Sequence, residues 1–271
     1  MRMIRSMELR GKRVLITGGS RGIGEALAHA FAGAGAAVAL VARSAAALES
    51  LATQLGGTAH AADLSDPAQV STLIPRVEDQ VGPIDVLVNN AGIDSTVDFT
   101  DVSDEHLRTV TEVNYLAPAE LCRQAVPRML LRGGGHIVNV SSMGAYMAFP
   151  GCVAYAASKA ALSQFTAGLR ADFRGLPIGT TLVELGPVPT DMLAAVEEYP
   201  PMAMAFRRFY RMGLMVDVPR EKVAREVVRA VTRGQRHVRL PRRSASFPIL
   251  VAIPRRATEL ALTGIPHQSA D

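Results

Sequence analysis

The chain has 271 residues, of which 48% are hydrophobic and 20% are charged, and its formal net charge is +4. This length and composition predict a soluble, enzyme-sized globule with one large α/β domain or two small ones. The arginine excess forms no basic stripe interleaved with aromatic residues, so we expect no nucleic-acid partner.

Cysteine content and apolar runs indicate the compartment. The chain has two cysteines, Cys122 and Cys152, which define no disulfide framework and favour a reducing compartment. Residues 1–13 carry several charges and no apolar stretch of signal-peptide length. The longest uncharged run, 133–158, contains polar residues and glycines that suit a buried strand and a loop better than a membrane span. We therefore expect a cytoplasmic protein.

Short β-branched runs alternate with helical patterns along the first half of the chain, which predicts crossover units and a parallel sheet. In chain order, strands are predicted at 14–17, 38–42, a short stretch leading to Asp63, 84–88, 136–140, 179–183 and 237–240. Helices are predicted from 23 to the 33–35 turn, at 45–55, from an Asp66-Pro67 cap to about Gly82, and from 153 to about 173. No linker divides them. We predict one domain over 1–271, an α/β fold with a doubly wound, mainly parallel sheet of about seven strands.

A glycine cluster, Gly18, Gly19, Gly22 and Gly24, lies between the first predicted strand and the first predicted helix. Glycines at such a place let the backbone approach a cofactor pyrophosphate, whose charge the N–H groups of the helix N-terminus can meet. Glycines also commonly serve only a tight turn. The position between strand and helix favours dinucleotide binding.

Tyr155 and Lys159 are four residues apart at the start of a predicted helix, so both lie on one face of it. Carbonyl reduction needs a proton donor at the oxygen as hydride reaches the carbon, and alcohol oxidation needs the same group as a base. A tyrosine pKa of about 10 is too high for a base at neutral pH unless an ammonium and the oxidised nicotinamide stabilise the phenolate. Lysine occurs only at positions 12, 159 and 222. This scarcity favours a functional pair over an accidental one on an exposed helix.

Together these motifs resemble the short-chain dehydrogenase/reductase family, in order through the chain as far as about Asp191. The matching segments are Thr17-Gly18-x-x-x-Gly22-x-Gly24, Asn89-Asn90-Ala91-Gly92 and Tyr155-x-x-x-Lys159. The resemblance implies a Rossmann-type fold and hydride transfer between a nicotinamide cofactor and a carbonyl or alcohol substrate, with Tyr155 as general acid or base. We also expect a homodimer or homotetramer, and no metal.

The resemblance assigns further catalytic positions. Ser142 stands thirteen residues before Tyr155, the family's spacing, and is expected to hold the substrate oxygen. Ser141 is the competing assignment, and either serine could merely cap the turn. Asn114 matches the asparagine that helps to hold a water chain to Lys159, although taken alone it would be structural.

The resemblance also assigns the cofactor groove. Asp63 resembles the family's adenine-contacting acid, with a turn or cap carboxylate as the alternative, and Asn90 serves the groove, the sheet backbone or both. The segment 183–190 resembles the nicotinamide loop, but has Leu185 where the family usually has proline. The predicted cofactor contacts are Gly18, Ser20, Arg21, Gly22, Ile23, Gly24, Arg43, Asp63, Leu64, Asn90, Ala91, Gly92, Tyr155, Lys159, Gly186, Val188 and Thr190.

The end of the second predicted strand bears on cofactor choice. NAD-selective sites usually place an acid there, whereas NADP sites need a cation for the 2′-phosphate. This strand ends in Ala42-Arg43-Ser44 without an acid, and Arg21 can approach from the glycine loop. These residues predict NADP(H), with NAD(H) as the alternative.

The chain after Thr190 indicates where substrate specificity lies. In the resembled family this region forms a mobile lid, here assigned to 191–216, although ordinary packing would also explain its apolar side chains. They are Tyr199, Met202, Met204, Phe206, Phe209, Tyr210, Met212 and Met215. Together with Met143, Tyr146, Met147 and Phe149 they predict an apolar substrate pocket.

Two questions stay open in the sequence. The variable C-terminal extension, 241–271, combines arginines with an apolar stretch; a subunit contact or a lid-supporting tail is expected, and a weak membrane-surface contact is the alternative. The alternatives to an NADP(H)-dependent enzyme are a catalytically silent NADP-binding regulatory protein and an NAD-dependent alcohol dehydrogenase.

Overall fold

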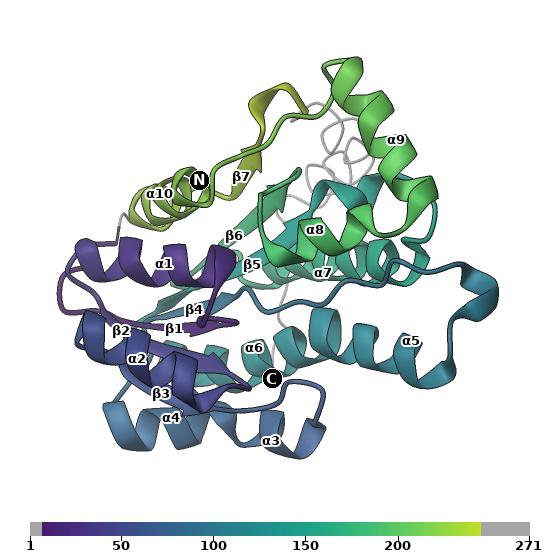
Figure 1. The fold of residues 1–271 in the computed structure, drawn as a ribbon. Coiled ribbons are helices and arrows are strands. Elements are labelled where there is room, and N and C mark those ends of the chain that lie inside the picture. Colours follow the sequence, from purple (N-terminus) through teal and green to yellow (C-terminus); the bar gives the residue numbers. More distant parts are fainter. Residues whose placement is uncertain (1–6, 245–271) are drawn as a thin grey trace.

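The computed structural model describes residues 7–244, which form a seven-stranded sheet in the order β3-β2-β1-β4-β5-β6-β7. Every pair of neighbouring strands is parallel (Figure 1). The strands are β1 (Arg13–Thr17), β2 (Ala37–Ala42), β3 (Thr58–Ala61), β4 (Val86–Asn89), β5 (Gly135–Ser142), β6 (Ile178–Leu185) and β7 (His237–Leu240). The predicted doubly wound α/β fold is confirmed.

Helices cover both faces of the sheet, as its nearly continuous apolar strands require. The longer helices are α1 (Gly22–Gly33), α2 (Ala45–Leu55), α4 (Leu73–Val81), α5 (Asp104–Thr111), α6 (Ala117–Leu131), α7 (Val153–Asp172), α9 (Pro200–Arg211) and α10 (Arg220–Arg233). Buried side chains of α1, α2 and α10 pack on one face, and those of α4 and α6 pack on the other. Alternate residues of β1 show the division, because Val14 and Ile16 face the first core and Leu15 faces the second.

The connection between β3 and β4 differs from its prediction. Asp66 caps a helix as expected, accepting a hydrogen bond from the Ala68 N–H at 2.9 Å, but this helix, α3 (Pro67–Ser71), ends before α4 begins. Pro75 lacks the N–H that would continue the helix, and a proline ring crowds the carbonyl four residues earlier, here that of Ser71. The Ile74 N–H donates instead to Gln124 Oε1 at 3.2 Å.

The fourth strand also begins later than predicted, at Val86 rather than at residue 84. Ile84 is buried as its apolar side chain suggests, but its N–H donates to Glu78 Oε1 at 2.9 Å and is therefore not available to the sheet.

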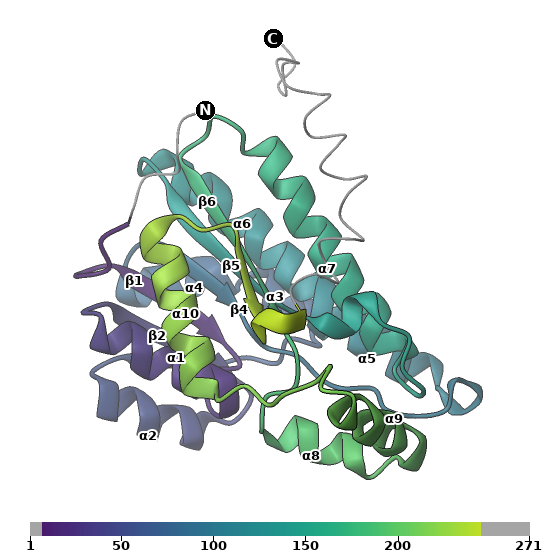
Figure 2. The same ribbon diagram turned by 90° about the horizontal axis from the view of Figure 1, so that it is seen from above.

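Helices α8 (Asp191–Glu197) and α9 lie beyond the carboxyl ends of the central strands, as the view in Figure 2 shows. None of the helices within residues 7–244 is both long and apolar enough to cross a membrane. Most of the C-terminal extension, from residue 245 onward, lies outside the described residues, as do residues 1–6.

Candidate active site

A cavity of about 810 Å³ opens at the carboxyl ends of the strands and is covered on one side by α8 and α9. It is lined by the glycine loop after β1, the end of β2, the segment after β4, the start of α7 and the loop after β6. All the predicted cofactor contacts line this cavity, and so does Ser142. Among the predicted site residues, only Asn114 does not. With the segment after β3 and the end of β5, the fold thus brings predicted residues from seven separate segments into one place.

The glycine loop needs its glycines for its own packing as well as for a ligand. A methyl group on Gly24 would lie 1.9 Å from the Gly18 carbonyl oxygen, so no larger residue fits there. Gly18 has a φ of +64°, and a methyl group on it would lie 2.9 Å from the Ala91 Cα. No side chain caps the α1 N-terminus after Arg21. The backbone N–H groups of the first turn of α1 therefore border the cavity without a side-chain partner of the cap residue, and they can hold an anion.

Two of the predicted cofactor contacts also have structural partners. The Asn90 Nδ2 donates to the backbone oxygens of Thr17 at 3.0 Å and Gly18 at 3.3 Å, which fixes the end of β1. Asp63 accepts hydrogen bonds from the Ser65 N–H at 2.9 Å and the Ser65 hydroxyl at 2.7 Å. These bonds, with a smaller contribution from Arg43, hold the pKa of Asp63 below its usual value. Both residues therefore line the cavity and also stabilise backbone: Asn90 holds the end of β1, and Asp63 holds the turn at Ser65.

The two candidate serines differ in what their hydroxyls contact. The Ser141 hydroxyl is buried against α7, donating to the Lys159 carbonyl oxygen at 3.0 Å and lying 2.8 Å from the Ser163 hydroxyl. Ser142 instead accepts from the Gly144 N–H at 3.0 Å, lies 3.5 Å from the Leu185 carbonyl oxygen, and is close enough to Tyr155 to lower its pKa. Geometry therefore favours Ser142 as the serine that can reach a ligand beside Tyr155.

Lys159 and Tyr155 lie together on the first turns of α7. The Lys159 side chain is buried, its Nζ donates to the Val140 carbonyl oxygen at 3.1 Å, and it lies 5.9 Å from the centre of the Tyr155 ring. Burial lowers the pKa of Lys159 to about 8.

Burial raises the pKa of Tyr155, and the nearby Ser142 hydroxyl opposes this only in part. The sequence predicted a lowered pKa for Tyr155 from the combined charges of Lys159 and an oxidised nicotinamide. Among the groups of the chain itself, the desolvation of the phenolate has the largest effect, and the pKa is raised. The protonated phenol is the form that can donate a proton to a carbonyl oxygen.

Asn114 lies behind the cavity, in a π-helical turn, η2 (Glu112–Leu116), between α5 and α6. Its amide donates to the Ile93 carbonyl oxygen at 2.9 Å and to the Ser158 hydroxyl at 3.0 Å, and it accepts from the Ile93 N–H at 2.9 Å. A methyl group on Gly92 would lie 3.2 Å from both Asn114 Oδ1 and Lys159 Nζ. Asn114 therefore joins the segment after β4 to α7 next to Lys159.

The two arginines of the cofactor prediction have different surroundings. Arg21 forms an ion pair with Asp191, the first residue of α8, at 2.8 Å, and both side chains are largely exposed. Arg43 is exposed at the end of β2 and lies close enough to Asp63 to affect its pKa. Both arginines line the cavity.

The far end of the cavity is mostly apolar. Phe149 packs edge-on against Phe206 and Phe209 of α9, with ring centres 5.4 Å and 5.2 Å apart. The apolar lining includes Met143, Met147, Phe149, Met192, Met202, Phe206 and Met215. Six side chains of the predicted pocket do not line the cavity: Tyr146, Tyr199, Met204, Phe209, Tyr210 and Met212. Met204 and Met212 are more than 60% exposed.

Sequence reasoning missed Asp94, which lines the cavity among these apolar groups. Its carboxylate contributes to raising the pKa of Tyr155 and of Cys152. The available signal was its position, two residues after the Asn89-Asn90-Ala91-Gly92 motif.

Comparisons with known proteins agree with this geometry. Residues 12–200 match the short chain dehydrogenase family. A short chain dehydrogenase of Pseudocercospora fijiensis is 36% identical over 229 residues, which cover 79% of this chain and 72% of that protein. The 1-deoxy-11-beta-hydroxypentalenate dehydrogenase of Streptomyces exfoliatus is 39% identical over 195 residues, 69% of this chain and 71% of its own.

A gluconate 5-dehydrogenase of Burkholderia cenocepacia, solved in complex with NADP and tartrate, superposes with a TM-score of 0.78. It is 26% identical, and the match covers 88% of this chain and 98% of that one.

A parallel Rossmann-type sheet with a cavity at the carboxyl ends of its strands is the arrangement in which enzymes of this fold class bind dinucleotides. The chain belongs to the short-chain dehydrogenase/reductase family, whose enzymes act on CH–OH groups with NAD(P).

Proposed function

We propose that the protein transfers hydride between NADP(H) and an apolar carbonyl or alcohol substrate, with Tyr155 as the general acid or base. The observation that supports this most is that Ser142, Tyr155 and Lys159 line the same cavity as the glycine loop. When bound, the nicotinamide supplies or accepts the hydride at the substrate carbon. The chain's own residues handle the proton and the substrate oxygen.

In the reducing direction, the Ser142 hydroxyl orients the carbonyl oxygen, and the Tyr155 phenol donates its proton to that oxygen. The Lys159 ammonium, buried beside the ring, stabilises the phenolate that remains. Asn114 holds the segment that borders Lys159. In the oxidising direction the Tyr155 phenolate takes the proton of the alcohol. The positive charge of Lys159 stabilises that phenolate before the transfer.

The cofactor preference rests on the two arginines at the adenosine end. We assign the 2′-phosphate of NADP(H) to Arg43 and Arg21, because β2 ends without an acid that would bind the ribose of NAD. The related gluconate 5-dehydrogenase that binds NADP supports this preference. Charge-assisted contacts to a phosphate contribute roughly 1.5 to 3 kcal/mol each before solvent screening.

Replacing Arg43 by Asp tests the cofactor assignment. Arg43→Asp is expected to weaken NADPH binding about tenfold or more and to leave NADH binding nearly unchanged, because only NADPH carries the 2′-phosphate. The two dissociation constants are measured by titration. The control is Arg10→Asp, an exposed arginine before β1, at the opposite edge of the sheet from the cavity. An unchanged NADPH-to-NADH ratio in Arg43→Asp would contradict the assignment.

The substrate class rests on the methionine and phenylalanine side chains at the far end of the cavity. A panel of ketones and aldehydes of increasing apolar size, each incubated with NADPH, tests the enzymatic proposal and the substrate class together. Larger apolar carbonyls are expected to give the higher kcat/KM. Cofactor binding without turnover of any compound would instead support a silent regulatory protein.

The remaining proposals concern organisation. We assign residues 191–216 as a substrate lid on a single domain, because α8 and α9 cover the cavity and Phe206 and Phe209 of α9 contact Phe149 below them. The family membership supports a homodimer or homotetramer in the cytoplasm. Light scattering on the purified protein measures the oligomeric state.

A further inference from the structure

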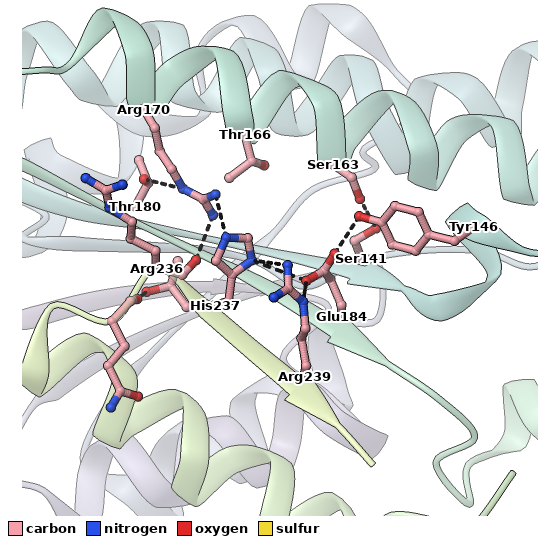
Figure 3. Close-up of polar contacts among 12 residues, drawn as sticks. Ser141, Tyr146, Ser163, Thr166, Arg170, Thr180, Glu184, Arg236, His237 and Arg239 are labelled. Carbon is pink, nitrogen blue, oxygen red and sulfur yellow. Dashed lines mark hydrogen bonds and ion pairs between the residues drawn. The ribbon is translucent and has the colours of Figure 1, made fainter. Parts of the chain in front are cut away.

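Glu184 carries a negative charge into the interior of the sheet. It lies on β6, next to Leu185 and the loop that follows, and its side chain is 0% exposed. A buried carboxylate is costly unless it is paired and hydrogen-bonded, so its partners show what it does. Figure 3 shows those partners, which come from β7 and from the turn after β5.

One carboxylate oxygen of Glu184 faces β7. Its Oε2 accepts from Arg239 Nε at 2.6 Å and lies 3.3 Å from His237 Nδ1. Arg170 of α7 lies behind His237, with its Nη1 at 2.9 Å from His237 Nε2. Arginine only donates, and an arginine faces each nitrogen of the His237 ring, because Arg239 Nη2 lies 3.0 Å from His237 Nδ1. Glu184 Oε2 is therefore fixed by the Arg239 guanidinium, with the His237 ring beside it.

The other oxygen of Glu184 faces the turn that follows β5. Its Oε1 accepts a hydrogen bond of 2.5 Å from the Tyr146 hydroxyl (Figure 3). Tyr146 is the last residue of η3 (Met143–Tyr146), the single turn that follows Ser142. Ser142 caps the start of this turn through its bond with the Gly144 N–H, and the Tyr146 ring ties its end to β6.

The register of the sheet brings the two ends of the Tyr146–Glu184 contact, here called the tether, close together. Glu184 pairs with Ser141 across β5 and β6, and Leu185 pairs with Ser142. The turn that carries Ser142 is thus held to the strand that leads into the nicotinamide loop. Hydrogen bonds to a charged group are shorter and stronger than neutral ones, so this contact is suited to fix a turn that backbone bonds alone hold weakly.

We propose that Glu184 and Tyr146 are positioning residues that hold the Ser142 hydroxyl at the reacting oxygen. The inference rests on the proposed function, in which Ser142 orients the substrate oxygen. Loss of the tether would let η3 shift, and the Ser142 hydroxyl would shift with it while the cofactor end of the cavity stayed intact. The tether therefore acts on the chemical step more than on cofactor binding.

Tyr146→Phe removes only the tethering hydroxyl. We expect kcat to fall about tenfold, the effect of losing one hydrogen bond to a charged group, while the Kd of NADPH stays within about twofold of the parental value. Glu184→Gln removes the charge and is expected to lower kcat in the same way, at a cost in stability because Arg239 loses its counter-charge. The control is Thr232→Val, which removes a hydroxyl that donates to the Val228 carbonyl oxygen within α10.

A double-mutant cycle with Ser142→Ala distinguishes positioning from a general structural effect. If the tether acts through Ser142, Tyr146→Phe has little further effect on kcat in the Ser142→Ala background. An equal loss of kcat in both backgrounds would overturn the inference, as would a parental kcat in Tyr146→Phe while Ser142→Ala is slow. Full activity of Ser142→Ala itself would instead contradict the proposed role of Ser142, and the positioning role with it.

Discussion

At the residue scale, the protonation of Tyr155 depends on neighbouring groups with opposite effects on its pKa. Burial and the carboxylate of Asp94 favour the neutral phenol, whereas Ser142 favours the phenolate. The neutral phenol suits carbonyl reduction, and the phenolate is needed for alcohol oxidation. Asp94 is the smallest of these influences on the pKa of Tyr155. Because we propose Tyr155 as the acid or base, we expect the charge of Asp94 to shift the pH range in which each direction is favoured.

Asp94→Asn should lower the pKa of Tyr155, because a negative charge that disfavours the phenolate is removed. Alcohol oxidation rises as Tyr155 loses its proton, so the midpoint of its pH profile is expected to move to lower pH. The measurement is kcat/KM for NADP⁺-dependent oxidation as a function of pH. Asp101→Asn, at an exposed acid that does not line the cavity, is the control. A midpoint that stays in place would show that Asp94 does not act on Tyr155.

At the element scale, the glycine loop and α8 are joined by the ion pair of Arg21 and Asp191. An exposed pair of this kind contributes at most about 1 kcal/mol. It nevertheless occupies the guanidinium that we assign to the 2′-phosphate, so under this proposal Asp191 and the phosphate of NADP(H) compete for Arg21.

Asp191→Asn should release Arg21 and tighten NADPH binding by up to about fivefold, with little effect on NADH. Titration of both cofactors measures this. Asp104→Asn, which breaks an equally exposed pair with Arg108 on α5, is expected to change neither constant. Weaker NADPH binding in Asp191→Asn would mean that Asp191 supports the phosphate site rather than competing with it.

The sequence predicted those elements whose cause is local or motif-based. All seven strands and the long α7 follow from apolar runs and caps, and the glycine loop, Tyr155 and Lys159 follow from spacing. The break at Thr72 was missed, although Pro75 was a visible reason for it. The π-helical turn at Asn114 has no local signal, because its contacts to Ile93 and Ser158 come from distant segments.

Side-chain direction was the other limit of the sequence. Met202 and Met204 are two residues apart on α9, yet one lines the cavity and the other faces solvent. Composition marked this segment as apolar without separating its two faces. The partners of Glu184 were similarly hidden, because they lie 38, 53 and 55 residues away along the chain.

At the scale of the whole molecule, buried titratable groups make the fold sensitive to acid. His136 on β5 is buried, 2.8 Å from the Thr181 hydroxyl, and burial lowers its pKa to about 4. In the unfolded chain a histidine has a pKa of about 6.5. Between pH 6.5 and pH 4, His136 therefore binds a proton in the unfolded chain but stays neutral in the folded chain.

The free energy of unfolding should accordingly be highest above pH 6.5 and fall by roughly 3 kcal/mol towards pH 4 through His136 alone. Urea unfolding at a series of pH values measures this. Glu184, whose pKa is lowered, adds a further loss of stability as the pH falls through its folded value. His136→Gln should flatten the slope, whereas His29→Gln, at an exposed histidine, should not. Equal slopes in both variants would contradict the explanation.

In the proposed function, Tyr155 transfers the proton that accompanies hydride transfer. The most direct test of this role is the single-turnover rate of NADPH oxidation by Tyr155→Phe, with a carbonyl compound that the parental enzyme reduces. Only the hydroxyl is deleted, so NADPH should bind as in the parent while the rate falls by about a hundredfold or more. A parental rate in folded, NADPH-binding Tyr155→Phe protein would contradict the account.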